Sequence, residues 1–164
     1  MAIYQTGTTV IPTLAGTERI SVDNGAGGNT VATAQALAMS GAAPVISANT
    51  ATSSATLTAA NLYGSYDSVF LNLSGALGGA ANATLPTVAA LAALFPNGVT
   101  AGQGYMLTII NSSSGAYAWT VLTATGWTLT GTMTVAQNTT RTFIINFTSA
   151  STATLTSVGT GSYS

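Results

Sequence analysis

The chain of 164 residues has two basic and three acidic residues, no histidine and no cysteine, so it lacks the clustered side chains of acid–base catalytic sites, metal sites and disulfide frameworks. Two basic residues cannot neutralise a nucleic-acid backbone, and the net charge of -1 offers nucleic acid no electrostatic footprint. These numbers predict a non-enzymatic protein without cofactors, with one domain of ordinary size and room for an appendage.

The first seven residues lack the basic and apolar regions of a secretory signal peptide, so export by that route is not expected. Polar residues and glycines interrupt every apolar run well before the roughly 20 residues that a membrane-spanning helix requires. No membrane partner is therefore expected.

Residues 1–60 are rich in Thr, Ala, Ser, Asn and Gly, with a turn-forming run at 23–29. This composition predicts an N-terminal arm or anchoring segment that is partly extended. Apolar residues at helical spacing predict a short helix over 30–39 within it. The low-complexity stretch 44–58 is either extended or disordered.

Residues 61–164 are expected to form an antiparallel β domain. Residues 66–73 alternate as a strand that places Val69, Leu71 and Leu73 on one face. Residues 86–95 predict a short helix that ends at Pro96, and its apolar residues cover nearly all faces, so it should be buried.

Period-two alternation over 104–111 and 117–123, around a turn at 112–115, predicts a β-hairpin. Further strands are expected at 127–130, 133–135, 140–148 and 152–158. Strands at this spacing with polar turns are typical of a mainly β fold: an antiparallel sandwich, a jelly-roll-like domain or a short barrel. We expect one or two short helices and an extended N-terminal arm in addition to this β domain.

The few charges are candidates for a subunit interface. Arg141 begins the most apolar strand, where its guanidinium either anchors a neighbouring subunit or lies at a solvated strand end. Asp67 is its most obvious counter-ion. Glu18, Arg19 and Asp23 lie close together in the arm, where Glu18 and Arg19 could form a solvated or interfacial ion pair.

Four aromatic residues stand out in the predicted strands: Trp119, Trp127, Tyr105 and Tyr117. They could form a platform for a sugar ligand, but aromatic residues in strands more often fill a core or an interface. Recurring Thr-x-Thr patterns have no fixed period and suit the solvated face of strands.

A nearly neutral surface of Ser, Thr, Ala and Gly does little to keep monomers apart. Such a surface is tolerable if much of it is buried in an assembly. The shortage of charge thus favours a structural or binding protein.

Two parts of the chain resemble a known group of proteins. The run from Leu14 to Asp23, followed by residues 30–38, resembles the Leu-x-Gly-x-Glu-x-Ile/Leu-x-Val-Asp … Thr-x-x-Gln-Leu-Ala segment near the N-terminus of many tailed-bacteriophage virion proteins, tail fibres among them. Residues 69–75, 126–131 and 157–163 are similar to the small β domains of phage fibres and head decoration proteins.

The resemblance implies a homotrimer on a virion surface, made in the host cytoplasm and bound to the major capsid protein or another virion protein. Full fibres are usually much longer, so a capsid decoration (cement) protein or a small head fibre fits this chain better than a tail fibre. The alternative is a tail-fibre or receptor-binding β module that binds a host-surface glycan through surface aromatics.

Overall fold

The computed structural model describes residues 19–23, 29–33, 45–64 and 68–162. The chain divides into two compact units, Met1–Ala42 and Ala43–Ser164. Each unit is described by itself below.

The described part of the first unit is a β-hairpin. Strand β1 (Arg19–Asp23) pairs antiparallel with β2 (Asn29–Thr33). The helix predicted over 30–39 is therefore wrong for residues 30–33, and residues 34–39 lie outside the described part. β-branched residues in Asn29–Thr33 favour a strand, and the helical spacing alone did not reveal this.

The second unit begins earlier than the boundary predicted near residue 60. Strands β3 (Val45–Asn49) and β4 (Ala55–Thr56) both belong to it, each in a different sheet. Residues 44–58 were predicted to be either extended or disordered, and β3 and β4 show that the extended alternative is correct for these strands. The stretch is ordered because its backbone pairs with strands of the domain, which its low-complexity composition could not indicate.

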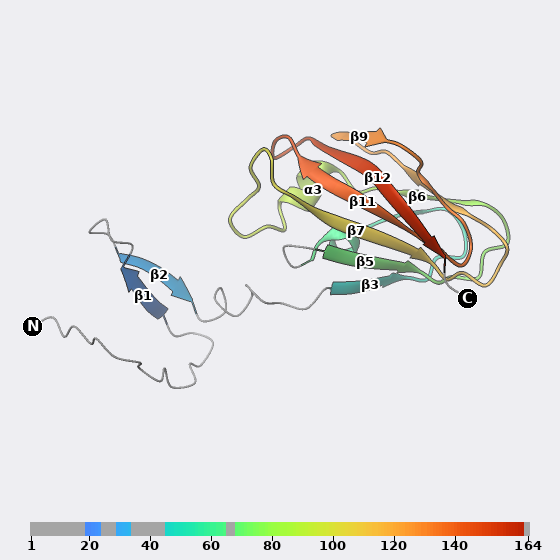
Figure 1. The fold of residues 1–164 in the computed structure, drawn as a ribbon, viewed down its shortest axis with the longest axis horizontal. Helices are drawn as coiled ribbons and strands as arrows, with labels where there is room; N and C mark the ends of the chain where they lie inside the picture. The colour runs from blue at the N-terminus through green and yellow to red at the C-terminus, as the bar shows by residue number, and fades with distance from the viewer. Residues whose placement is uncertain (1–18, 24–28, 34–44, 65–67, 163–164) are drawn as a thin grey trace, which may run out of the picture. The chain divides into compact units, whose positions relative to one another are not determined.

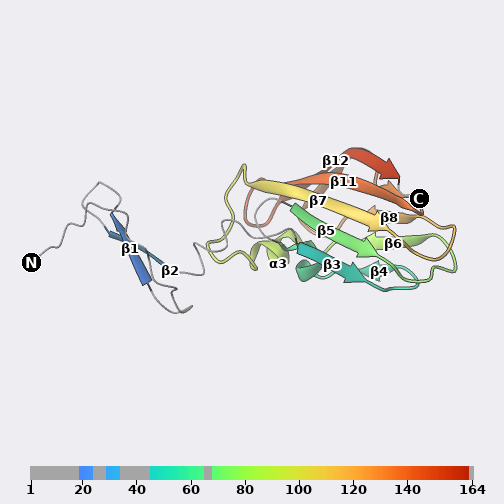
Figure 2. The ribbon, with the colours of Figure 1, turned by 60° about the horizontal axis from the view of Figure 1, so that its bottom comes forward.

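The described residues of the second unit form a six-stranded and a four-stranded sheet (Figures 1 and 2). The six-stranded sheet has the order β3, β5 (Ser68–Leu73), β7 (Gly104–Asn111), β11 (Thr139–Phe147), β12 (Ala153–Ser162) and β9 (Trp127–Thr130). The four-stranded sheet has the order β10 (Thr134–Val135), β8 (Trp119–Leu122), β6 (Ala81–Thr84) and β4.

A single apolar core lies between the two sheets. Val69, Leu71 and Leu73 of β5 are fully buried, as their alternation predicts. The core continues through alternate residues of both sheets, among them Leu107, Ile109, Trp119, Val121, Phe143, Ile145 and Leu155. The mainly β, sandwich-like class with short helices is thus confirmed.

The chain crosses from one sheet to the other three times in the same sense, as β3 to β4, β5 to β6 and β7 to β8. Each crossing forms one coil, and successive coils stack with parallel strands: β3–β5–β7 in one sheet and β4–β6–β8 in the other. β9 also pairs parallel, with β12. The sheets are therefore mixed, and the expected antiparallel pairing holds only for β7–β11–β12 and β8–β10.

Equivalent backbone bonds link the coils at equivalent places. The amide of Leu57 donates to Thr84 O at 2.7 Å, and the amide of Leu85 donates to Leu122 O at 3.0 Å. Leu57 and Leu85 are both buried, and each follows an Ala-Thr pair that ends a strand. The first two coils therefore repeat the same local sequence, Ala-Thr-Leu, in the same structural role.

Two short helices follow these strands, α2 (Ala59–Leu62) and α3 (Val88–Ala92), and they contact each other. The side chains of Thr58 and Thr87 cap them by accepting backbone amides. The helix predicted at 86–95 is confirmed in kind but is shorter. It buries one face only, since Ala89 and Ala90 are exposed.

The predicted hairpin of residues 104–111 and 117–123 is wrong. β7 lies between β5 and β11, whereas β8 lies in the other sheet beside β6. The polar run between them is a corner, held by the fully buried Asn111, whose Nδ2 donates to Tyr117 O and Val135 O, each at 3.0 Å. Its Oδ1 accepts from the amide and the hydroxyl of Ser113.

Gly75 lies where the second coil passes the first, and a Cβ placed on it would lie 1.9 Å from Ala51 O. Gly75→Ala is therefore expected to lower the free energy of unfolding by about 1–3 kcal/mol through steric overlap with backbone. Urea denaturation measures this. Gly78→Ala is the matched control, because a Cβ there meets nothing within 4 Å; equal effects of the two substitutions would contradict the packing described.

Candidate functional site

The four aromatics predicted as a ligand platform do not lie together on the surface. Trp119 is 0% exposed, while Trp127 and Tyr105 are each 8% exposed. Tyr117 alone of the four is exposed, at 40%. The platform interpretation is therefore wrong, and the core-filling alternative is correct for three of the four, because their strand positions face the opposite sheet.

The two indoles differ in their hydrogen bonding. Trp127 Nε1 donates to Pro86 O at 2.7 Å, which ties β9 to the start of the α3 segment. Within the described residues, Trp119 Nε1 is buried and has no hydrogen-bond partner. Both side chains thus contribute apolar area, and within the described part of the chain Trp127 alone of the two hydrogen-bonds its indole nitrogen.

Arg141 binds within its own chain. Its Nε donates to Thr134 O of β10 at 2.7 Å, and its Nη1 donates to Ser157 Oγ of β12 at 3.0 Å. The half-buried guanidinium therefore links an edge of the four-stranded sheet to the six-stranded sheet. Asp67, its expected counter-ion, lies outside the described residues.

The other charged candidates lie in the first unit. Arg19 and Asp23 are the end residues of β1, opposite Thr33 and Asn29 in β2. Glu18 lies outside the described residues, as do the side chains of Arg19 and Asp23. Their interface role stays a prediction.

The outer face of the six-stranded sheet carries an apolar patch. Ile46 is 73% exposed, Met106 48% and Ile144 42%. Ile46 lies opposite Phe70 in the β3–β5 pair, and Met106 lies opposite Ile144 in the β7–β11 pair. The outer-face patch consists of Ile46, Met106 and Ile144 together with Ile110, which alternation places on the same face.

The surroundings of this patch are polar but uncharged. Thr108 and Thr142 lie side by side on the same face, with their hydroxyls 3.2 Å apart. No described residue that alternates onto this face is charged, since Arg141 lies on the opposite parity of β11 and reaches β10. The face thus combines exposed apolar side chains with hydroxyls.

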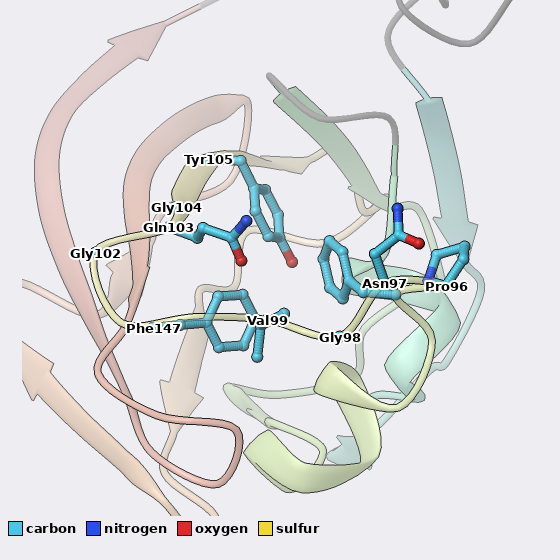
Figure 3. Close-up of a pocket in the computed structure, with 10 residues that line it drawn as sticks. Pro96, Asn97, Gly98, Val99, Gly102, Gln103, Gly104, Tyr105 and Phe147 are labelled. Atoms are coloured by element: carbon cyan, nitrogen blue, oxygen red, sulfur yellow. The ribbon is translucent and has the colours of Figure 1, made fainter. Parts of the chain in front are cut away.

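A cavity of about 410 Å³ opens at the end of the sandwich where β7 begins and β11 ends (Figure 3). Figure 3 shows Gln103, Tyr105 and Phe147 pointing toward a common space. The full lining comprises Phe95, Pro96, Asn97, Gly98, Val99, Gly102, Gln103, Gly104, Tyr105 and Phe147. The residues come from the loop after α3 and from the two strand ends.

The loop that forms this cavity is held to the sheet. The amide of Gly102 donates to Phe147 O, and the amide of Phe147 donates to Gln103 O, both at 2.8 Å. Gln103 Oε1 accepts from the amide of Thr100 at 2.7 Å. Gly98 (φ 68°) and Gly102 (φ 89°) adopt left-handed conformations that turn the loop back.

Aromatic side chains form the base of the cavity. Phe95 meets Phe147 edge to face, with ring centroids 5.7 Å apart, and lies 6.2 Å from Tyr105. Tyr63 packs against the same Phe95 ring at 5.0 Å. The rings therefore support one another before any ligand binds.

The hydroxyl of Tyr105 is committed to the fold. It donates to Leu62 O at 2.7 Å and joins β7 to the end of α2. Burial raises the pKa of Tyr105 well above its ordinary value. The ring is therefore neutral across the physiological pH range.

Within the part of the chain that the structure describes, no group of three or more His, Cys, Asp or Glu residues is placed to hold a metal ion. None of the described helices has both the length and the apolar character needed to span a membrane. Sequence reasoning missed both the outer-face patch and the cavity.

Comparisons of the chain with protein-family models, with curated proteins and with solved structures gave no match.

The two indoles provide a paired test of the core. Trp127→Phe leaves the buried Pro86 O without its donor, whereas Trp119→Phe removes a nitrogen that has no partner among the described residues. We expect Trp127→Phe to cost about 1–3 kcal/mol more unfolding free energy than Trp119→Phe. Chemical denaturation of both variants checks this, and an equal or reversed order would contradict the assigned hydrogen bond.

The buried phenol of Tyr105 predicts a loss of stability in alkali. Above a pH of about 10 the unfolded chain releases this proton while the folded chain keeps it, so the unfolding free energy falls by up to about 1.4 kcal/mol per pH unit. Tyr105→Phe should remove this contribution, although it weakens the protein at neutral pH. Tyr117→Phe, at an exposed position, should retain the fall; denaturation at pH 8 to 11.5 distinguishes them.

Proposed function

We propose that this chain is a non-enzymatic virion structural protein, most consistent with a homotrimeric capsid decoration (cement) or head-fibre protein. Its N-terminal segment attaches to the major capsid protein or another virion protein. Its β unit associates with other copies. The outer-face patch is the observation that carries this proposal.

Water contact with this patch is unfavourable, and each Å² of apolar area removed from water contributes about 25 cal/mol. Exposed apolar patches on a soluble protein commonly mark interaction sites. Because the face carries no described charge, two copies can approach through it without burying an unpaired ion. The same face supplies Thr hydroxyls that can pair across the contact.

The chemistry of the chain supports a structural function over catalysis. With five ionisable Asp, Glu, Lys and Arg side chains in total and no histidine or cysteine, acid–base and metal mechanisms lack their usual groups. The resemblance to phage virion segments adds the expected location on a particle. A tail fibre is the alternative location for the same type of protein.

Self-association through the outer-face patch is testable by sedimentation velocity. The full chain should sediment as a trimer, and Ile144→Lys should weaken that association at least roughly a hundredfold, because it buries an unpaired charge. Leu122→Lys is the matched control, since Leu122 is 39% exposed on β8 of the other sheet, against 42% for Ile144. It should leave the trimer intact.

A wild-type chain that stays monomeric at high concentration would refute the assembly proposal. Equal sedimentation of the two lysine variants would refute the chosen face. Attachment to particles is measured separately, by adding the purified chain to virions stripped of it. Failure to bind them would remove the virion assignment while leaving the self-association result standing.

A further inference from the structure

The cavity beside Phe95 and Gln103 has no part in the proposed assembly, and its lining defines a ligand class. All ten lining residues are uncharged, and the Tyr105 hydroxyl already donates to Leu62 O. A charged ligand would lose its hydration without gaining a counter-ion. The ligand that this cavity accommodates is therefore neutral.

Polar and apolar groups are separated within the lining. Phe95 and Val99, both half-buried, supply a ring and a branched alkyl group at the base, above the buried rings of Tyr105 and Phe147. Asn97 and Gln103 supply exposed carboxamides at the rim. A matching ligand has one apolar face and an edge that both donates and accepts hydrogen bonds.

The rim amides retain hydrogen-bonding capacity. Gln103 Oε1 is held by the Thr100 amide, which orients the side chain and leaves the two N–H donors of Nε2 for a ligand. Gly98 and Gly102 leave the backbone of the rim uncovered, since a Cβ on either would meet nothing within 4 Å. The rim is therefore open at both glycines, whose amides already donate to Phe95 O and Phe147 O.

The volume is of the right size for a small ligand. A cavity of about 410 Å³ lies within the roughly 300–1,000 Å³ of typical small-molecule sites. The aromatic rings pack against one another, and two backbone hydrogen bonds hold the loop to β11. The site is therefore fixed before binding, which reduces the entropy lost on association. These features distinguish it from a gap between mobile side chains.

We propose that this cavity binds a neutral sugar ring, whose C–H face packs on Phe95 and Val99 and whose hydroxyls bond the Gln103 and Asn97 amides. The ring belongs to a free saccharide or to the end of a neutral glycan. This site is different from the rejected platform of Trp119, Trp127, Tyr105 and Tyr117, and shares only Tyr105 with it. It does not depend on the virion assignment.

The test uses the full chain and the methyl pyranosides of glucose, galactose, mannose and N-acetylglucosamine. Saturation-transfer NMR should detect at least one of them, with its ring C–H protons receiving the strongest transfer. Val99→Trp, which fills the cavity, should abolish the signal. Gln103→Ala should weaken binding at least about tenfold, through loss of the amide donors.

Val158→Trp is the matched control, because Val158 is 52% exposed on β12 and does not line the cavity. It should bind as the wild type does. Circular dichroism and melting temperature establish that each variant is folded. Neutral oligosaccharides ending in the preferred ring, compared with the free pyranoside, distinguish a glycan end from a free sugar.

Three results would overturn the proposal: no transfer to any of the four sugars at millimolar concentration, binding that survives Val99→Trp, or a preference for choline over every sugar. The last result would mean that the aromatic rings attract a cation instead. None of these results depends on whether the chain forms trimers.

Discussion

Parallel backbone pairing between successive coils is the constraint on which the rest of the domain depends. β5 bonds to β3 on one side and to β7 on the other, and β6 bonds likewise to β4 and β8. Each coil must therefore keep the same rise and register as its neighbour, so that inward residues of both sheets meet in one core. The two helices occupy the equivalent return path after β4 and β6, which places α2 against α3 and sets the loop from which the cavity is built.

Side-chain hydroxyl and amide groups fasten neighbouring elements of this domain to one another. Ser47 Oγ donates to Asn61 O at 2.9 Å and fastens β3 to α2, and Ser112 Oγ donates to Asn72 Oδ1 at 2.6 Å between neighbouring coils. Buried Asn111 fixes the corner between the sheets. Such bonds require specific geometry yet leave the surface uncharged, so the fold gains a unique arrangement without the electrostatic repulsion that keeps copies of a protein apart.

The sequence predicts the strands far better than their partners. Alternation located β5, β7 and β11 because one face of each is buried, but it says nothing of parallel or antiparallel neighbours, so β7 and β8 were expected to form a hairpin. Ala-Thr-Leu recurs at 55–57 and 83–85 in the coils but also at 153–155 in β12, so the tripeptide alone does not identify stacked coils. Alternation does not show whether Trp119 is buried or exposed, because the two faces of a strand have the same periodicity. The cavity is lined by Phe95 and Phe147, which are far apart in the sequence and meet only in the tertiary fold.

The two ends of the coil stack are not equivalent. Beyond the third coil, the antiparallel strands β10 and β11 cover β8 and β7. At the other end, β3 and β4 are the outermost strands among the described residues. β4 has only two residues, which itself limits pairing at an edge, whereas β3 has five residues and contains no charge, proline or bulge. Ile46 lies on that outermost strand and also in the outer-face patch. An association that buried the patch at Ile46 would therefore come close to the edge of β3, on which no described strand pairs.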